Sequence, residues 1–516
     1  MTGDLSNLIQ RKVTLGFIFM AGCAGMGVIL YATRWGAAIS DDTYDYIHAA
    51  RDLLAGRGFT LTPHFPPGLS LVLGAIGLFG PDPLVSVRWL NAIIFGVAII
   101  LAGAILLAMT GSAFFALVGS LIFLSADVLI ETHSWAMSEP LFICFMLSGF
   151  LALALSKRDE RWVGTCLAGL LFGLAAVTRY IGAALPLALA LAWLLRASLP
   201  FNQRLRRAVL SGLTGLAPVA MYMLRNETLI GRPTSRVLAW HPMDLGGWRA
   251  AWSTVLIWFI PGRFVHGKEW VWLMGFSFLG LAGAVIWWLR RKPSESSSTW
   301  SEPASKRSEP WGQTSSEQVA SGHAVVAPVL ALGILCYLGV LFVSRTFFDT
   351  AIPMDDRLLS PVLVMLLLLL LAGLARLWTA RVIGSKAAVG LIILAIFAVN
   401  LTRSVDTVRS YHTVGRGYAS ARDAISETYA YLRKKPDIPI YSNAFAAIYF
   451  WTGRDTYSIP STAGLAEMKA DMRRNGAYLV VFDSIPVELY HVTQAELIDG
   501  LVVQIHLSEA TIYRSP

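Results

Sequence analysis

Charged residues are scarce in this sequence, and cysteines are scarcer still. Only 15% of the 516 residues are Asp, Glu, Lys or Arg, whereas 55% are hydrophobic. A water-soluble protein needs a larger charged surface, so this balance excludes a soluble globular protein. Apolar runs of about 20 residues, the length that crosses a bilayer, recur between Thr14 and Asn400. The sequence therefore predicts a polytopic membrane protein.

The few cysteines show no pattern that would cross-link the chain or bind zinc. All of them lie inside apolar runs, and none has a paired spacing in a loop outside the membrane. A disulfide framework or a structural zinc site would need such spacing, so neither is expected. The cysteines are Cys23, Cys144, Cys166 and Cys336.

The net charge of +9 does not indicate a nucleic-acid partner. From Arg403 to the end, 12 basic residues balance 12 acidic ones, so the excess lies entirely in the membrane portion. Basic residues beside apolar spans mainly set orientation in the bilayer. We therefore expect contact with membrane lipids and no binding of nucleic acid.

We predict eleven transmembrane spans. An odd number places the two termini on opposite sides of the membrane. With a cytoplasmic N-terminus, the inner loops hold 17 Lys and Arg and the outer segments 13, which agrees with the positive-inside rule. The C-terminus is then external. The predicted spans are 14–33, 84–108, 112–130, 137–155, 162–178, 181–196, 207–225, 270–289, 324–343, 358–377 and 386–402.

Composition divides the chain into two domains. Residues 1–403 form the membrane domain, in which 293–322, rich in Ser, Pro and Glu, is expected to be a flexible cytoplasmic linker. Residues 404–516 have the composition of a small soluble α/β domain, expected on the outer face. Its predicted helices are 418–432 and 464–474, and its predicted strands are 438–442, 477–483 and 501–507.

The first outer segment, 34–83, is too long and too polar for a simple turn. It begins with a carboxylate cluster, Asp41, Asp42 and Asp45, and an amphipathic helix that continues to Leu54. Neighbouring carboxylates raise one another's pKa, so one of them is a candidate general base. The alternative is a solvated helix N-terminus, where Asp stabilises the first turn. A short apolar helix up to Phe79 follows, too short to span and expected at the membrane interface.

Arginines at the outer ends of the spans are candidate phosphate ligands. Guanidinium groups hold phosphate through charge-assisted, often bidentate, hydrogen bonds. Arg179 has the strongest individual case, because it interrupts an otherwise apolar stretch and is costly inside a bilayer. Ordinary contact with lipid headgroups is the alternative for each of them. The selected residues are Arg51, Arg88, Arg179 and Arg357, together with His64 in the first outer segment.

Glu139 precedes Pro140 at the start of a predicted span. Glu before Pro suits a helix N-terminus, so a structural role and a place in the site both remain open. Whether a divalent metal takes part is also open, and no cofactor is otherwise expected.

The motifs of the first outer segment resemble those of GT-C glycosyltransferases. The similarity is to the bacterial branch that contains lipid A aminoarabinose transferases and relatives of protein O-mannosyltransferases. It covers most of the chain, although the motifs are short. They are Asp42-x-x-x-Tyr46, Ala50-Arg51, Gly56-x-Gly58-Phe59, Pro66-Pro67-Gly68 and Val87-Arg88-Trp89-Leu90-Asn91, with Met137-Ser138-Glu139-Pro140 and Thr178-Arg179-Tyr180 further on.

This resemblance implies a multi-pass enzyme of the bacterial plasma membrane. It would transfer a sugar from a polyprenyl-phosphate carrier to a lipid, protein or glycan acceptor at the outer face. The family's base falls on Asp42, with Asp41 as the alternative, and Tyr46 is a further site candidate. Many relatives carry Lys before Pro66-Pro67, whereas this chain has Phe65 there and His64 one position earlier.

Two rival functions remain open. A transporter or flippase of lipid-linked sugars also needs many spans and outer basic residues, but such proteins commonly contain internal repeats, and we detect none. A polysaccharide polymerase or ligase shares the acceptor chemistry, and only the first-segment motifs argue against it.

Overall fold

A computed structural model of the chain describes residues 2–60, 64–156, 161–260, 314–349, 352–379, 384–436 and 438–516. It divides into two compact units. One comprises Met1–Met26, Ile93–Thr132 and Ser138–Asp406, and the other comprises Gly27–Ala92, His133–Met137 and Thr407–Pro516.

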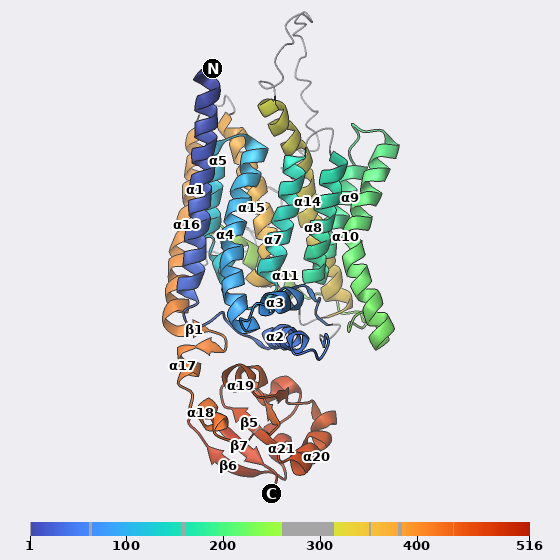
Figure 1. Cartoon of the computed structure of the whole chain (residues 1–516), viewed down its shortest axis with the longest axis vertical. Helices are drawn as coiled ribbons and strands as arrows, with labels where there is room; N and C mark the ends of the chain where they lie inside the picture. Colours follow the sequence, from blue (N-terminus) through green and yellow to red (C-terminus); the bar gives the residue numbers. More distant parts are fainter. Residues whose placement is uncertain are drawn as a thin grey trace, which may run out of the picture. The chain divides into compact units, whose positions relative to one another are not determined.

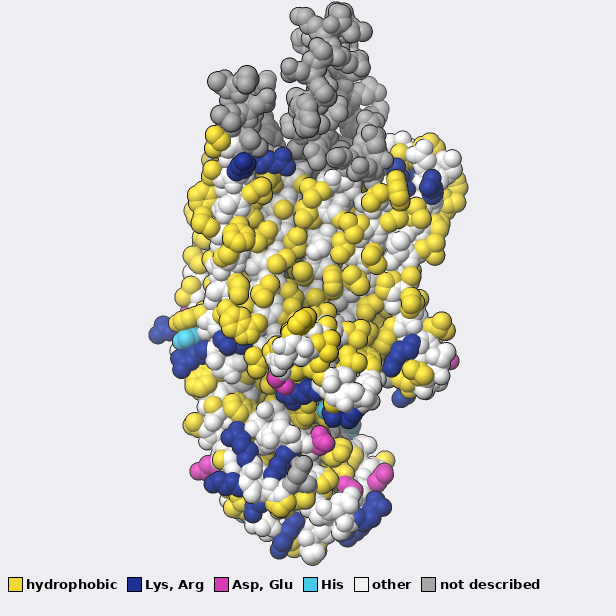
Figure 2. Space-filling view, in the orientation of Figure 1, with side chains coloured by type: hydrophobic (Ala, Val, Ile, Leu, Met, Phe, Trp, Pro, Cys, Tyr) yellow, Lys and Arg dark blue, Asp and Glu magenta, His cyan; other side chains and the backbone are white. Residues whose placement is uncertain are grey.

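The first unit is a helical bundle (Figure 1). Several of its helices are apolar along their whole length, and Figure 2 shows hydrophobic side chains covering most of the visible face of these helices. Helices α1, α4, α6 and α16 continue into the second unit. The helices of the first unit are α1 (Thr2–Ala32), α4 (Pro83–Thr110), α5 (Ala113–Ser125), α6 (Asp127–Ser134), α7 (Glu139–Leu155), α8 (Arg161–Thr178), η1 (Tyr180–Ala183), α9 (Ala184–Leu194), α10 (Phe201–Ile230), α11 (Leu245–Ile257), α14 (Thr314–Phe347), α15 (Asp356–Thr379) and α16 (Ser385–Val414).

The structure confirms an integral multi-pass membrane protein. Among the described residues, six helices are long and apolar enough to cross a bilayer, namely the segments of α1, α4, α10, α14, α15 and α16. The predicted spans 137–155, 162–178 and 181–196 correspond to shorter apolar helices. The predicted span 270–289 and most of the predicted linker 293–322 lie outside the described residues. The count of eleven spans stays a prediction.

The predicted span 112–130 is bent, which the sequence analysis did not foresee. Helices α5 and α6 meet at an angle of 55°, with Ala126 in an extended conformation between them. The next residue, Asp127, is buried and lies 3.4 Å from the guanidinium of Arg403. Since a carboxylate is costly inside an apolar bundle unless it is paired, a bend that brings Asp127 to its partner is favoured over a continuous helix.

The helix break at Arg179 is confirmed. Helix α8 ends at Thr178, Arg179 has an extended backbone with φ −149° and ψ 127°, and η1 starts at Tyr180. The N-terminus of α7 at Glu139 is confirmed as well, with Pro140 in its first turn.

The second unit contains the first outer segment and a five-stranded sheet. The outer segment forms α2 (Asp41–Leu54) and α3 (Gly68–Gly77), as predicted. After α16 the chain forms β1 (Gly415–Arg416), β2 (Ala419–Ser420), α17 (Ala421–Ala424), α18 (Glu427–Arg433), β3 (Ile440–Ser442), α19 (Phe445–Thr452), β4 (Thr456–Ser458), η3 (Thr462–Gly464), α20 (Leu465–Asn475), β5 (Tyr478–Phe482), η4 (Val487–Tyr490), α21 (Gln494–Ile498), β6 (Val502–His506) and β7 (Ala510–Arg514).

The sheet has the strand order β4-β3-β5-β7-β6, with β4, β3 and β5 parallel and β7 antiparallel to both its neighbours. Alternate residues of β5 face opposite sides: Leu479 packs with Met468 and Met472 of α20, and Val480 packs with Leu432 of α18 and Ile448 of α19. Helices therefore cover both faces of the sheet.

Two details of this module differ from the sequence prediction. Residues 418–432 form β2 and two short helices, because Ser420 and Ser426 each cap a new helix start. The strand predicted at 501–507 is not the last one, since β7 follows it and pairs with both β5 and β6. Burial of Ile512 and Tyr513 against opposite core clusters explains this inner position.

Glycines allow α8 and α10 to approach closely within the bundle. A Cβ atom on Gly173 would lie 2.5 Å from the carbonyl oxygen of Gly215, which is far inside van der Waals contact. Gly212, also on α10, has no atom within 4 Å of the corresponding position.

We expect Gly173→Ala to destabilise the folded protein by about 1–3 kcal/mol, because the added methyl group forces the two backbones apart. Gly212→Ala is the matched control and should leave stability unchanged or slightly raised. The thermal unfolding midpoint in detergent measures both. Equal midpoints for the two variants would contradict the close approach of α8 and α10.

Candidate active site

Helix α2 carries the predicted carboxylate cluster at its start. Ser40 is the N-cap, and its hydroxyl and that of Thr43 form a capping box across the first turn. Asp41 and Asp42 occupy that turn, where the positive end of the helix dipole favours negative charge. The structural alternative for these residues, a helix N-terminus stabilised by Asp, is therefore present. It does not exclude a chemical role.

Asp45, one turn further along α2, has the most perturbed surroundings of the cluster. Partial burial, together with the like charges of Asp42 and Asp41, raises the pKa of Asp45 to about 6. A carboxylate with such a pKa exchanges protons readily near neutral pH. The sequence placed Asp45 in the cluster but did not distinguish it as a proton acceptor, because its burial depends on residues distant in the chain.

Arg51, at the other end of α2, makes a bidentate ion pair. Its Nε and Nη2 donate to Asp82 at 2.9 and 3.0 Å, and its guanidinium lies 5.0 Å from the ring centre of Tyr449. The sequence analysis selected Arg51 as a phosphate ligand and did not identify Asp82 or Tyr449. A guanidinium held in this way must exchange partners before it binds phosphate, so Arg51 is the weaker candidate.

The other candidates of the second unit contact neighbouring groups within that unit. Arg88 donates from Nη2 to the carbonyl of Leu30 at 3.0 Å and from Nε to Thr33 at 3.1 Å, and so caps the end of α1. Tyr46 is 3% exposed, and its ring packs 5.1 Å from that of Phe65. His64 is exposed, with its ring 4.6 Å from Phe65.

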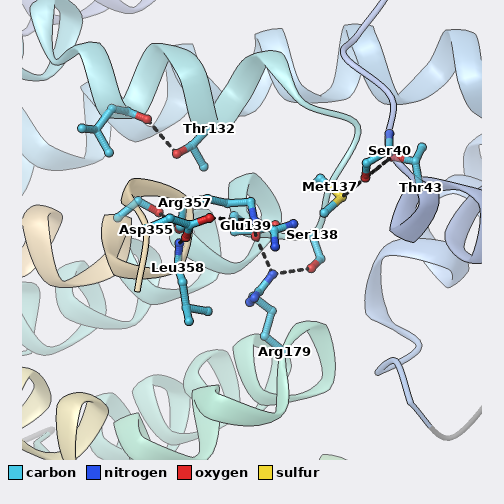
Figure 3. A network of polar contacts seen from close by, with 12 residues as sticks. Ser40, Thr43, Thr132, Met137, Ser138, Glu139, Arg179, Asp355, Arg357 and Leu358 are labelled. Atoms are coloured by element: carbon cyan, nitrogen blue, oxygen red, sulfur yellow. Dashed lines mark hydrogen bonds and ion pairs between the residues drawn. The ribbon is translucent and has the colours of Figure 1, made fainter. Parts of the chain in front are cut away.

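In the first unit the structure brings Glu139, Arg179 and Arg357 together (Figure 3). Arg179 Nη1 lies 2.7 Å and Arg357 Nε 3.4 Å from the same oxygen, Oε1 of Glu139. Arg179 also donates to the hydroxyl of Ser138 at 3.2 Å. The three charged residues come from the start of α7, the break after α8 and the start of α15.

Burial and charge distinguish this cluster from headgroup contacts. The Glu139 side chain is 1% exposed, whereas those of Arg179 and Arg357 are 18% and 29% exposed. The carboxylate is thus buried behind two cations that remain partly accessible. Asp355 lies 4.0 Å from Arg357 and supplies a second, more exposed, negative charge.

This arrangement suits an oxyanion. A guanidinium carries five N–H donors in a planar fork that matches phosphate, and here Glu139 fixes the position of two such forks from behind. Glu139 and the more exposed Asp355 balance the two cations, so an oxyanion would bind through the guanidinium donors rather than through an excess of positive charge. Sequence reasoning identified each residue but not that Glu139 accepts contacts from both arginines.

No metal centre is evident in the described part of the chain. Within those residues, no three His, Cys, Asp or Glu side chains are grouped so that they could hold a metal ion.

Comparisons with known proteins bear on the fold. The model of a family described as dolichyl-phosphate-mannose-protein mannosyltransferase matches residues 50–226. No curated protein matches the sequence. The structure of ArnT from Cupriavidus metallidurans bound to undecaprenyl phosphate is similar, with a TM-score of 0.52 and 13% identity over 96% of this chain and 98% of that chain. The apo form of the same protein gives a TM-score of 0.53 and 14% identity, over 96% of this chain and 97% of that chain.

A more distant likeness extends to an archaeal enzyme. The Archaeoglobus fulgidus oligosaccharyltransferase tethered to an acceptor peptide gives a TM-score of 0.50 and 11% identity, over 91% of this chain and 69% of that chain. The chain is therefore a polytopic membrane protein with the GT-C glycosyltransferase fold and a small C-terminal sheet module. The recognition of this fold from the sequence is confirmed.

We expect Arg179→Gln to weaken the binding of a phosphate monoester by roughly tenfold or more, because it removes a charge-assisted donor. Arg179→Lys, which keeps the charge but not the fork, should show a smaller loss. Arg232→Gln, at an exposed arginine just after α10, is the matched control. Titration of the purified protein with a lipid phosphate monoester measures all three. Unchanged affinity in folded Arg179→Gln would remove Arg179 from the phosphate site.

Proposed function

We propose that this chain is a membrane glycosyltransferase that takes a sugar from a polyprenyl-phosphate carrier and transfers it to an acceptor at the outer face of the membrane. The observation that carries the proposal is the buried Glu139 carboxylate with Arg179 and Arg357 in contact with it. The GT-C fold supports it. The ArnT structure holds undecaprenyl phosphate, the kind of carrier that we propose here.

In the proposed reaction the acceptor's hydroxyl or amine attacks the anomeric carbon of the donor sugar. The bond between that carbon and the phosphate oxygen breaks, and the carrier phosphate leaves with the bonding electrons. Arg179 and Arg357 stabilise the charge that develops on the phosphate, so the leaving oxygen needs no proton. Arg51 and Arg88 are secondary candidates, because both are engaged in local contacts.

The acceptor must lose a proton as it attacks, and we assign that proton to a carboxylate of α2. Asp42 is the proposed base, as its alignment with Tyr46 and Arg51 implies, and Asp41 is the alternative. Asp45 is the third carboxylate of the helix, and its burial, together with the charges of Asp42 and Asp41, raises its pKa to about 6. The acceptor is a lipid, a protein or a glycan.

We expect Asp42→Asn to lower the transfer rate by roughly 10²–10⁴, because Asn keeps the size of Asp but accepts no proton. Binding of undecaprenyl phosphate should persist. The measurement is mass spectrometry of glycolipids and surface glycans in cells that lack the gene and carry one variant on a plasmid.

Asp41→Asn is the paired comparison. Full activity of Asp42→Asn with loss of activity in Asp41→Asn would move the base to Asp41. Normal products from both variants would defeat the mechanism and favour a transporter of lipid-linked sugars. Identical glycans with and without the gene would refute transfer by this protein.

The proposed membrane topology has a cytoplasmic N-terminus and an external C-terminal module, with 404–516 as the outer domain. We expect Ser461→Cys, at an exposed position of that module, to react with a membrane-impermeant maleimide in intact cells. The unmodified protein controls for Cys23, Cys144, Cys166 and Cys336. Labelling of Ser461→Cys only after the membrane is opened would place the module inside and contradict the proposal.

A further inference from the structure

The backbone just before α2 is held on both sides by segments distant in the sequence. On one side Ala38 pairs with Trp135 in a parallel bridge, in which the Ala38 N–H donates to the Ser134 carbonyl at 2.8 Å. On the other side Ile39 pairs with Gly417, and the Tyr418 N–H donates to the Ile39 carbonyl at 3.0 Å. These contacts lie within one compact unit. They fix the two residues that precede the N-cap of the helix bearing the proposed base.

Gly417 makes this contact possible. Its φ is +58°, and a Cβ atom there would lie 2.2 Å from the Ile39 carbonyl oxygen. A residue with a side chain would therefore be strained and would push the segment away from Ile39. The glycine lets the connection from α16 to the sheet module run directly against the first outer segment.

Tyr418 adds a side-chain bond to this backbone contact. Its hydroxyl donates to Oδ1 of Asp41 at 3.2 Å, and its own carbonyl accepts from the indole N–H of Trp451, on α19, at 2.7 Å. Burial and the charge of Asp41 raise the pKa of the Tyr418 phenol, so it stays protonated and remains a donor. Tyr418 thus connects the sheet module to the first residue of α2.

A second contact supports the same junction from the side of α2. The ring of Tyr44 lies 4.9 Å from that of Tyr449 and 5.2 Å from that of Phe445, both on α19. The Arg51 guanidinium also packs on Tyr449. Helix α2 is therefore held by α19 along its length as well as by Tyr418 at its start.

We infer that Tyr418 is a positioning residue, which acts through Asp41 to hold α2 and its neighbouring carboxylate Asp42 in place for catalysis. This inference rests on the proposed function. It divides the roles of the adjacent carboxylates: Asp41 attaches the helix to the sheet module, and Asp42 accepts the proton. The C-terminal module is then part of the catalytic apparatus.

The test uses Tyr418→Phe, which removes only the hydroxyl. Its matched control is Tyr441→Phe, which removes a similar bond, from Tyr441 to Asp471 at 2.8 Å, elsewhere in the module. The measurement is the rate at which the natural glycan product appears, per molecule of protein, when each variant is induced in cells lacking the gene. We expect Tyr418→Phe to slow the rate by about 5- to 10-fold and Tyr441→Phe to leave it unchanged.

Two further readouts separate positioning from a general loss of structure. Undecaprenyl phosphate affinity should be the same in Tyr418→Phe as in the unmodified protein. In an Asp41→Ala background, Tyr418→Phe should slow the rate by less than about twofold, because the bond is already absent. Should Tyr418→Phe not fold, Trp451→Phe releases the Tyr418 carbonyl and is expected to slow the reaction in the same sense.

Three results would overturn the inference: a normal rate in Tyr418→Phe, an equal loss in Tyr441→Phe, or independent multiplicative losses in Tyr418→Phe and Asp41→Ala. An inactive Asp41→Ala beside an active Asp42→Asn would also overturn it, since Asp41 would then be the base. If the unmodified protein forms no product, the proposed function itself fails. Non-additive shifts of the unfolding midpoint in the same double-mutant cycle would then still show the Tyr418–Asp41 bond.

Discussion

The cost of burying a carboxylate among apolar helices is the constraint on which the helical unit depends. An unpaired ion in such surroundings is strongly destabilised, so Glu139 requires cations within contact distance. Arg179 and Arg357 supply them, and each stands at an interruption or start of a helix where its own charge can be reached. The pairing of Asp127 with Arg403 at the bend between α5 and α6 follows the same rule.

In the cluster of Glu139, Arg179 and Arg357, the ion pairs that satisfy the buried carboxylate also orient the arginines for a ligand. A guanidinium fixed by a buried carboxylate is already oriented, so a phosphate that binds it pays less for ordering the side chain. In the second unit, Asp82 accepts from two donors of Arg51, and the Leu30 carbonyl accepts from Arg88. The arginines thus differ in what holds the guanidinium: Arg179 and Arg357 share one buried carboxylate oxygen, whereas Arg51 makes a bidentate pair.

Several features were readable from the sequence because they depend on local chemistry. Apolar runs indicated the spans, Arg179 in an apolar stretch indicated a break, and the cluster of Asp41, Asp42 and Asp45 marked the start of an amphipathic helix. The features that the sequence analysis missed are those that neighbours distant in the chain decide. Nothing local marks the bend at Ala126, which depends on Arg403, or the inner position of β7, which depends on β5 and β6.

The sequence by itself determined the class of the protein, the short helices of segment 34–83 and the set of charged residues able to do chemistry, because hydropathy and helix signals act within a few residues. Only the tertiary structure decided which of those charges meet. The bond between Tyr418 and Asp41 joins residues 377 positions apart, and two separate helix termini bring Arg179 and Arg357 to Glu139. An ion pair or hydrogen bond depends on distance in space, and no periodicity along the chain encodes that distance.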